Sequence, residues 1–212
     1  METQIKLIKA ELRKLLKTRI SANTCTLGNY EKTTDETHKA CTRFLESTLY
    51  ENASVVFCFL STKNEISTNQ IIKKALNDGK KVAVPRVIFG SNKMEFYYLK
   101  DIPLEEQTSI GSFNILEPKI DLEKVDFSKI GEKAVIICPG LGFDKKGFRL
   151  GKGKGFYDCF FDCLEKENPS FFKSFVKIGI CYLIQIVEKI PSEKNDVKMD
   201  FLLTAEELVK CN

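Results

Sequence analysis

The stretch that decides the fold is residues 134–158, AVIICPGLGFDKKGFRLGKGKGFYD. Its first five residues form an apolar run that predicts a buried strand over 134–138, and its last residues begin a segment, 155–166, that predicts a helix. The loop between them is dense in glycine, lysine and arginine. Glycine lets backbone N–H groups approach a ligand closely, and the N-terminus of a helix favours anions. This strand, loop and helix together predict a phosphate-binding site.

The loop does not match the common phosphate motifs. A P-loop places Lys and then Ser or Thr after its second glycine, but Lys152 is followed by Gly153. The dinucleotide motif G-x-G-x-x-G also fails, because the glycines here are Gly151, Gly153 and Gly155. The competing interpretation is a surface turn with solvated charges. The density of glycine and basic residues favours the ligand site.

Working outward, short apolar runs alternate with amphipathic segments along the chain. The expected strands are 55–60, 81–85, 95–99, 134–138, 176–180 and 200–203, and the expected helices are 2–20, 35–49, 68–77, 155–166 and 205–210, with loops at 21–29, 90–93 and 101–131. This alternation predicts an α/β fold with a mostly parallel sheet flanked by helices. We expect a single domain over residues 1–212.

Three polar segments directly follow expected strands. They are Ser61–Glu65, Pro85–Arg86 and the glycine-rich loop. Ligands bind at the carboxyl ends of strands in open α/β sheets. We therefore expect these segments to converge on one cleft, and we expect the long loop 101–131 to cover part of it.

The composition is that of an ordinary globular protein, with 212 residues and a net charge of +4. A charge this small does not indicate nucleic-acid binding. No apolar run reaches the length of a membrane span, and residues 1–20 mix charges into their apolar positions, unlike a signal peptide. The eight cysteines form no C-x-x-C pair, and His38 lies in a polar stretch. We expect a cytoplasmic protein with reduced thiols, no membrane or nucleic-acid partner, and no Ser-His-Asp or Cys-His chemistry.

The resemblance to a known family starts from residues 139–158, which are similar to the signature of the 5-formyltetrahydrofolate cyclo-ligases, also called methenyltetrahydrofolate synthetases. Other elements of that family appear in its order along the chain: Lys9-x-x-x-Arg13, Glu65-Ile66-Ser67-Thr68, Lys81 to Arg86, Gly111 to Pro118, Gln185, and Pro191 to Asp196. The combination covers nearly the whole chain and is specific, although each short piece alone is weak. Phe156 departs from the pattern, because many relatives carry tyrosine there.

The resemblance implies an enzyme that uses ATP and Mg²⁺ to cyclise 5-formyltetrahydrofolate to 5,10-methenyltetrahydrofolate, with release of ADP and phosphate. In this reaction the formyl oxygen takes the γ-phosphoryl group, and N10 then attacks the formyl carbon. The protein mainly positions the partners and neutralises phosphate charge. The resemblance also implies a fold similar to sugar-phosphate isomerases and CoA transferases, and we expect a monomer.

The resemblance also implies roles for particular residues. Arg149 and Lys154 would be catalytic, and Asp158 and Asp196 would hold Mg²⁺. ATP would be bound by Lys9, Arg13, Arg149, Leu150, Gly151, Lys152, Gly153, Lys154, Gly155, Phe156 and Tyr157. The folate would be bound by Leu60, Glu65, Lys152, Gly153, Lys154, Gly155 and Phe156. From the residues alone, Lys9 and Arg13 could equally belong to a solvated basic helix face, and Phe156 could be ordinary core packing.

Two other classes of function are considered. A sugar-phosphate isomerase or CoA-transferase-like enzyme on the same architecture would show no ATP dependence, and fold alone does not decide between them. A binding module for RNA or phosphate would show steep salt dependence. The small basic excess makes this second class the weaker one.

Overall fold

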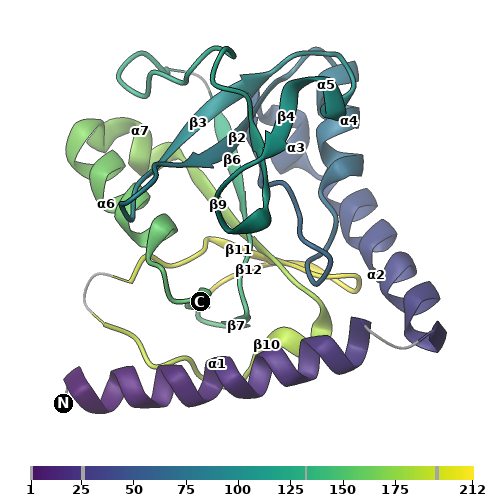
Figure 1. Cartoon of the computed structure of the whole chain (residues 1–212), viewed down its shortest axis with the longest axis vertical. Helices are drawn as coiled ribbons and strands as arrows, with labels where there is room; N and C mark the ends of the chain where they lie inside the picture. Colours follow the sequence, from purple (N-terminus) through teal and green to yellow (C-terminus); the bar gives the residue numbers. More distant parts are fainter. Residues whose placement is uncertain (1, 25–26, 132, 194–195) are drawn as a thin grey trace.

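The computed structural model describes residues 2–24, 27–131, 133–193 and 196–212, and its centre is a seven-stranded sheet (Figure 1). The strands are β1 (Val55–Phe57), β2 (Lys81–Val87), β3 (Met94–Leu99), β6 (Ala134–Cys138), β9 (Val176–Ile180), β11 (Phe201–Leu203) and β12 (Leu208–Lys210). Their order across the sheet is β12-β11-β9-β6-β1-β2-β3. The five central strands run parallel, and the two edge strands, β3 and β12, run antiparallel to their neighbours. The expected mostly parallel α/β sheet is confirmed.

Helices cover both faces of this sheet, as its continuous apolar strands require. One face packs against α2 (Leu27–Leu45), α3 (Thr48–Asn52) and α4 (Asn69–Asn77). The other face packs against α6 (Phe156–Glu167) and α7 (Pro169–Ser174). This second core is aromatic: the ring of Phe57 on β1 lies 5.2 Å from that of Phe96 and 5.1 Å from that of Phe175.

Smaller elements lie outside this sheet, and several of them border the carboxyl edge of its parallel strands. They are α5 (Leu104–Gln107), the hairpin β4 (Thr108–Ile110) and β5 (Leu116–Pro118) with η1 (Ser112–Asn114) between, and β7 (Gly142–Asp144), β8 (Arg149–Leu150), η2 (Leu183–Gln185) and β10 (Ile186–Val187). The strands β10, β7 and β8 form a second sheet in that order. The glycine-rich loop is therefore partly a hairpin rather than irregular chain.

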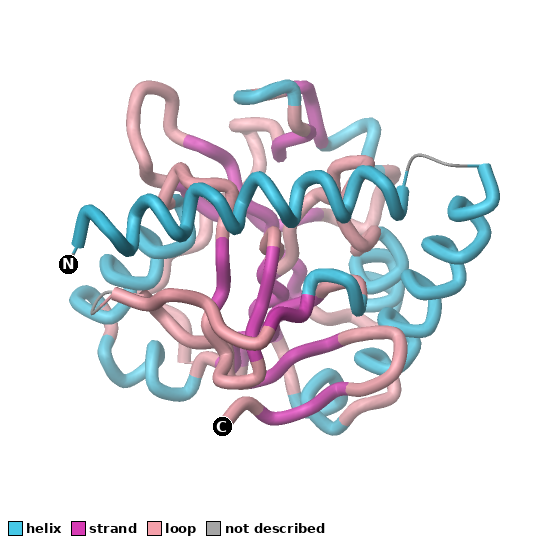
Figure 2. Tube along the Cα trace, turned by 90° about the horizontal axis from the view of Figure 1, so that it is seen from below, coloured by secondary structure: helices cyan, strands magenta, loops and turns pink. Residues whose placement is uncertain are grey.

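The long first helix, α1 (Glu2–Thr24), lies across this carboxyl edge (Figure 2). Its buried residues Leu16 and Ile20 pack against Leu141, Leu150 and Ile190. Through this third apolar cluster α1 packs against the glycine-rich loop. One face of the helix therefore points toward the carboxyl ends of the parallel strands. Among the described helices, α1 included, none is long and apolar enough to cross a membrane.

Several sequence predictions about local structure were wrong. The loop expected over 101–131 holds α5, η1 and the β4–β5 hairpin, and the helix expected over 35–49 is divided between α2 and α3. The loop expected over 21–29 is helical at 21–24 and 27–29, while residues 25 and 26 lie outside the described residues. The helix expected over 205–210 is instead strand β12, paired antiparallel with β11. The side chain of Thr204 accepts hydrogen bonds from the backbone N–H groups of Glu206 and Glu207, which closes the turn. Pairing with an open sheet edge outweighs the helical propensity of this short segment.

Candidate active site

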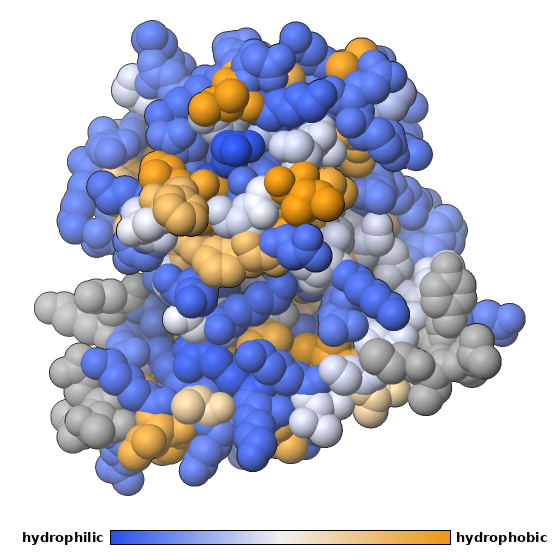
Figure 3. All heavy atoms as spheres, in the orientation of Figure 1, coloured by the Kyte–Doolittle hydropathy of each residue, from blue (hydrophilic) through white to orange (hydrophobic). Residues whose placement is uncertain are grey.

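A cavity of about 770 Å³ opens at the carboxyl ends of the parallel strands. It is lined by α1, the loop after β1, the end of β2, the η1 turn with its flanks, and the glycine-rich loop. On this face of the molecule, apolar side chains gather around the middle, above a band of hydrophilic ones that borders α1 (Figure 3). The expected convergence of distant segments on one cleft is confirmed, although Arg86 itself turns away and donates to the carbonyl oxygen of Pro118 at 2.6 Å.

Every residue that we predicted for the site lines this cavity: Lys9, Arg13, Leu60, Glu65, Arg149, Leu150, Gly151, Lys152, Gly153, Lys154, Gly155, Phe156, Tyr157, Asp158 and Asp196. The structure therefore brings the set together from positions almost 190 residues apart along the chain. Their individual roles stay predictions.

The glycine-rich loop is shaped by a buried carboxylate, Asp144. Its Oδ1 accepts hydrogen bonds from the backbone N–H groups of Lys146 and Phe148, at 3.0 and 3.1 Å, and its Oδ2 accepts one from Ile190 at 2.8 Å. Between them, Gly147 has φ +85°, and a Cβ there would lie 2.3 Å from the carbonyl oxygen of Met199. The turn therefore requires glycine at 147, and the three hydrogen bonds fix the loop that carries Arg149.

Glycine also lets the chain enter α6 from the loop. Gly153 and Gly155 have φ values of +98° and +72°, in the left-handed region that other residues rarely adopt. Gly155 is the residue that precedes the first turn of α6, and it offers no side chain to cap that turn. The N-terminus of a twelve-residue helix therefore points its partial positive charge toward the cavity.

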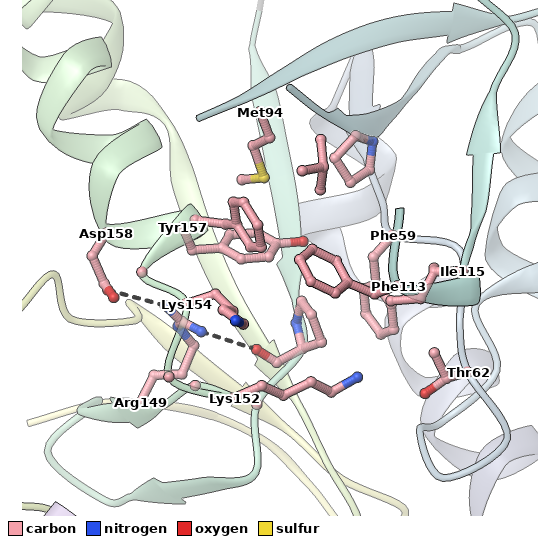
Figure 4. Close-up of a pocket in the computed structure, with 18 of the residues that line it drawn as sticks. Phe59, Thr62, Met94, Phe113, Ile115, Arg149, Lys152, Lys154, Tyr157 and Asp158 are labelled. Carbon is pink, nitrogen blue, oxygen red and sulfur yellow. Dashed lines mark hydrogen bonds and ion pairs between the residues drawn. The ribbon is translucent and has the colours of Figure 1, made fainter. Parts of the chain in front are cut away.

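Arg149 is the most buried cation of the loop, with 5% of its side chain exposed. Its Nη2 donates to Oδ1 of Asp158 at 3.0 Å and its Nη1 to the carbonyl oxygen of Pro139 at 3.3 Å (Figure 4). Its Nε is buried with no hydrogen-bond partner. A buried, unsatisfied donor is costly in a native protein and calls for an acceptor. The guanidinium also keeps one further N–H on each Nη, and these are the donors available to an anionic ligand in the cavity.

Helix α1 contributes two cations to the same region. Nε of Arg13 donates to the carbonyl oxygen of Gly151 at 3.0 Å. Nζ of Lys9 lies 2.8 Å from a carboxylate oxygen of Glu193 and 2.7 Å from one of Asp196. Burial by itself would lower the pKa of Lys9, but the hydrogen bonds and charges of these two carboxylates outweigh it and raise the pKa above its usual value. Lys9 is therefore held charged at the cavity wall.

Glu65 sits in the loop after β1 with both carboxylate oxygens engaged. Its Oε2 accepts hydrogen bonds from the backbone N–H and the hydroxyl of Thr62, both at 2.8 Å. Its Oε1 lies 2.7 Å from Nζ of Lys152. In addition, the hydroxyl of Tyr182 donates a hydrogen bond to the backbone carbonyl of Glu65 at 3.3 Å. This carboxylate is thus fixed in position and directly linked to the glycine-rich loop.

Aromatic side chains form the apolar wall of the cavity. The rings of Phe113 and Phe156 lie 6.0 Å apart, and Nζ of Lys154 lies 5.4 Å from the centre of the Phe113 ring. The hydroxyl of Tyr157 is directed toward Phe113 and Phe59 (Figure 4). That hydroxyl is buried with no partner, and burial raises the pKa of Tyr157 well above its usual value. It is therefore a neutral phenol.

The two predicted metal ligands face different cations. Asp158 pairs with Arg149, and Asp196 pairs with Lys9. Among the described residues, no group of three or more His, Cys, Asp or Glu side chains could hold a metal ion. Mg²⁺ commonly binds one or two carboxylates together with phosphate oxygens and water. The site fits a Mg²⁺ ion that arrives with a polyphosphate, and it does not fit a preformed protein cage.

Some cavity residues escaped the sequence analysis. Phe113 is 60% exposed and has a left-handed φ of 58°, and Met94 and Glu193 line the cavity as well. Phe113 and Glu193 lie inside segments that the resemblance had pointed to, 111–118 and 191–196, but no spacing singles them out there. Met94 is the first residue of an ordinary strand, so nothing in its local sequence distinguishes it.

Comparison with known proteins agrees with this geometry. The sequence profile of the 5-formyltetrahydrofolate cyclo-ligase family matches residues 5–205. The chain is 30% identical over 205 residues to a probable 5-formyltetrahydrofolate cyclo-ligase of Caenorhabditis elegans, which covers 97% of this chain and 96% of that protein. It is 32% identical over 194 residues to the 5-formyltetrahydrofolate cyclo-ligase of Haemophilus influenzae, covering 91% and 92% of the two chains.

Solved structures give the same picture. The NMR structure of the 5,10-methenyltetrahydrofolate synthetase of Aquifex aeolicus superimposes with a TM-score of 0.73 at 25% identity, covering 96% of this chain and 92% of that one. The synthetase of Mycoplasma pneumoniae shares the fold, with a TM-score of 0.65 at 19% identity over 93% and 98% of the two chains.

Proposed function

The chain belongs to the 5-formyltetrahydrofolate cyclo-ligase family, and from that premise we propose how its cavity works. The substrates are 5-formyltetrahydrofolate and ATP, and the products are 5,10-methenyltetrahydrofolate, ADP and phosphate. The observation that carries the proposal is the direct contact between the two halves of the cavity, in which Lys152 of the glycine-rich loop meets Glu65 of the loop after β1 at 2.7 Å. The family match does not favour the sugar-phosphate isomerase or CoA-transferase alternative.

The two substrates divide the cavity by chemistry. A reduced pterin has ring N–H donors and an apolar face. Glu65 accepts such donors, while Leu60 and Phe156 contact the ring, and the Phe113 ring beside Phe156 adds a second aromatic surface. The triphosphate needs cations and backbone N–H groups, which the basic end of the cavity supplies. These come from Lys9 and Arg13 on α1 and from residues 149–157.

The reaction needs no covalent protein intermediate. The formyl oxygen attacks the γ-phosphorus, the bond from that phosphorus to the β,γ-bridging oxygen breaks, and ADP leaves with the electron pair. N10 then attacks the activated formyl carbon, loses its proton, and the carbon–oxygen bond breaks to release phosphate. The formyl oxygen therefore ends in the phosphate product. The protein has to hold the two substrates in line and neutralise the charge on the moving phosphoryl group.

We assign this neutralisation to Arg149 and Lys154. Arg149 is fixed by Asp158 and by the Pro139 carbonyl, and its buried Nε is still without a partner. Among the described residues Lys154 forms no ion pair with a carboxylate, and it lies beside the aromatic wall where the two substrates would meet. One cation that is held by a carboxylate and one that is not suit a charge that moves from ATP to the formyl oxygen.

Mg²⁺ completes the proposal as a partner of the polyphosphate. When bound, it would neutralise phosphate oxygens. Asp158, with 44% of its side chain exposed at the cavity, and Asp196 are the carboxylates that would hold it. We further propose a cytoplasmic monomer, and on the mild net charge of +4 we propose that it has no nucleic-acid partner.

The test is direct. Purified protein is incubated with 5-formyltetrahydrofolate and Mg-ATP, and the absorbance of the methenyl product is followed together with the release of ADP. We expect the two products in equal amounts, with no reaction when ATP is omitted and a loss of rate when the metal is chelated. Product formation without ATP would overturn the proposal.

A further inference from the structure

A second cavity, of about 530 Å³, lies between α6, β3 and residues 124–128. Cys159 and Cys163 both line it, one helical turn apart on α6. Both thiols are half-buried and thus reachable from solvent. Met94 lines this cavity and the active-site cavity as well. The mechanism proposed above uses neither cysteine.

The two thiols interact with each other. Positions i and i+4 of a helix face the same side, with Cβ atoms about 5–6 Å apart. Burial raises the pKa of Cys159, the nearby thiol of Cys163 raises it further, and Lys93 acts against both. Sγ of Cys159 also lies 3.8 Å from Oδ1 of Asn92. The two cysteines therefore line the same cavity from one side of α6.

The other cysteines whose surroundings are described do not form a solvent-accessible pair. Cys58, Cys138 and Cys181 are fully buried in the sheet. Burial raises the pKa of Cys41 to about 12 and that of Cys211, the remaining half-buried thiol, to about 11. Cys159 and Cys163 are therefore set apart by their accessibility and by the cavity that they share.

The spacing decides what the pair can take. A disulfide needs Cβ atoms about 3.5–4.5 Å apart, which is closer than one undistorted helical turn allows. A structural zinc site needs four ligands, and the described residues offer no group of three or more candidate ligands. A single thiophilic atom that takes two sulfur ligands bridges the wider gap without moving the helix.

We propose that Cys159 and Cys163 form a two-thiol binding site for a thiophilic centre that accepts two sulfur ligands, such as a monosubstituted trivalent arsenical. With the hydrated form of phenylarsine oxide, two As–O and two S–H bonds break, two As–S bonds form, and two water molecules leave with the protons. Arsenic stays trivalent, so the step needs no oxidant or reductant. The neighbouring Met94 and Phe160 supply an apolar surface for the phenyl group.

The test uses intact, reduced protein and phenylarsine oxide at one equivalent, with the adduct followed by mass spectrometry and located by peptide mapping. A two-sulfur chelate survives an excess of a monothiol and is removed by a dithiol such as 2,3-dimercaptopropanol, whereas a one-sulfur adduct is lost to the monothiol. We expect one phenylarsenic group per chain, resistant to the monothiol, on the peptide that carries both cysteines.

Matched variants make the result specific. Cys159→Ser and Cys163→Ser should each lose the resistant adduct, while Cys211→Ser, which removes the other half-buried thiol, should keep it. Circular dichroism checks that each variant is folded. If a variant does not fold, the monothiol resistance and the mapped position of the wild-type adduct decide the test. A resistant adduct in either single variant, its location on another peptide, or loss of the wild-type adduct to the monothiol would overturn the proposal. Ready formation of a Cys159–Cys163 disulfide with oxidised glutathione would also contradict the spacing argument.

Discussion

Replacing Arg149 tests the central assignment, that the glycine-rich loop stabilises the moving phosphoryl group. The guanidinium has five N–H donors. One points to Asp158 and one to the Pro139 carbonyl, while the buried Nε has no partner. Donors thus remain for a ligand, on a group that two contacts already hold in place. Because these two contacts already order the side chain, binding a phosphate costs little further conformational entropy. The free-energy contribution of a phosphate contact there should therefore be near the upper end of its usual range.

A hydrogen bond to a charged group contributes about 1.5–3 kcal/mol. At about 1.36 kcal/mol for each tenfold change in rate, Arg149→Ala should lower kcat/KM by roughly 10- to 150-fold, and by more if two contacts are lost. Arg149→Lys keeps the charge but loses the planar fork, so it should lie between alanine and wild type. If the contact strengthens in the transition state, kcat falls together with kcat/KM; if it only binds ATP, the KM for ATP rises with kcat preserved.

Steady-state kinetics with ATP and folate varied in turn would measure these constants. Lys145→Ala is the matched control, because it removes one exposed positive charge from the same loop outside the cavity lining. We expect this control to keep full activity. Wild-type constants in both Arg149 variants, with circular dichroism unchanged, would refute the reasoning and make Arg149 a purely structural partner of Asp158.

Three further variants probe the rest of the site. Asp158→Asn should raise the Mg²⁺ concentration needed for half-maximal rate several-fold, and an unchanged Mg²⁺ titration would leave Asp158 only its pairing with Arg149. Glu65→Gln should raise the KM for the folate by roughly 10- to 150-fold with little change for ATP; a larger effect on ATP would move Glu65 to the nucleotide site. Gly147→Ala should lower the free energy of unfolding by about 2 kcal/mol or more in urea titrations, since it adds a steric clash to left-handed strain. Gly90→Ala, with φ +75° and open space around the new methyl, should cost about 1–2 kcal/mol, and equal losses at the two positions would contradict the predicted clash.

The sequence predicted the central sheet because its strands are short apolar runs. The expected strands 134–138 and 176–180 coincide with β6 and β9 residue for residue, and the expected helix 155–166 lies within one residue of α6. The two strands are buried on both faces, and the helix is buried along one stripe. Because this burial determines which positions are apolar, the hydrophobic pattern of the sequence predicts these elements. The C-terminal hairpin failed for the opposite reason. Its residues 205–210 favour a helix by their own propensities. Their pairing with β11 depends on an open edge of the sheet, which the sequence pattern of the segment itself does not predict.

The site shows the same division. The residues of the glycine-rich loop could be found because the chemistry of phosphate binding demands glycine and cations close together in sequence. Phe113 and Met94 could not be found in this way. Phe113 reaches the cavity through a left-handed backbone conformation, and Met94 reaches it because it lies at the end of a strand. The pairing of Lys152 with Glu65 is likewise invisible in the sequence, since 87 positions separate them and only the shared edge of the sheet brings them together.

The ion pairs explain how several cations can share one cavity before a nucleotide arrives. Lys9 pairs with Glu193 at 2.8 Å and with Asp196 at 2.7 Å. Arg149 pairs with Asp158 at 3.0 Å. Lys152 pairs with Glu65 at 2.7 Å, and the other carboxylate oxygen of Glu65 accepts hydrogen bonds from Thr62. Left unpaired, the buried charges of Lys9 and Arg149 would cost several kcal/mol each. In the function proposed above, a triphosphate would replace these carboxylates as the anionic partner of the cations. At Lys152 the same exchange would free an oxygen of Glu65 for the pterin, because Lys152 would then pair with a phosphate instead of that carboxylate.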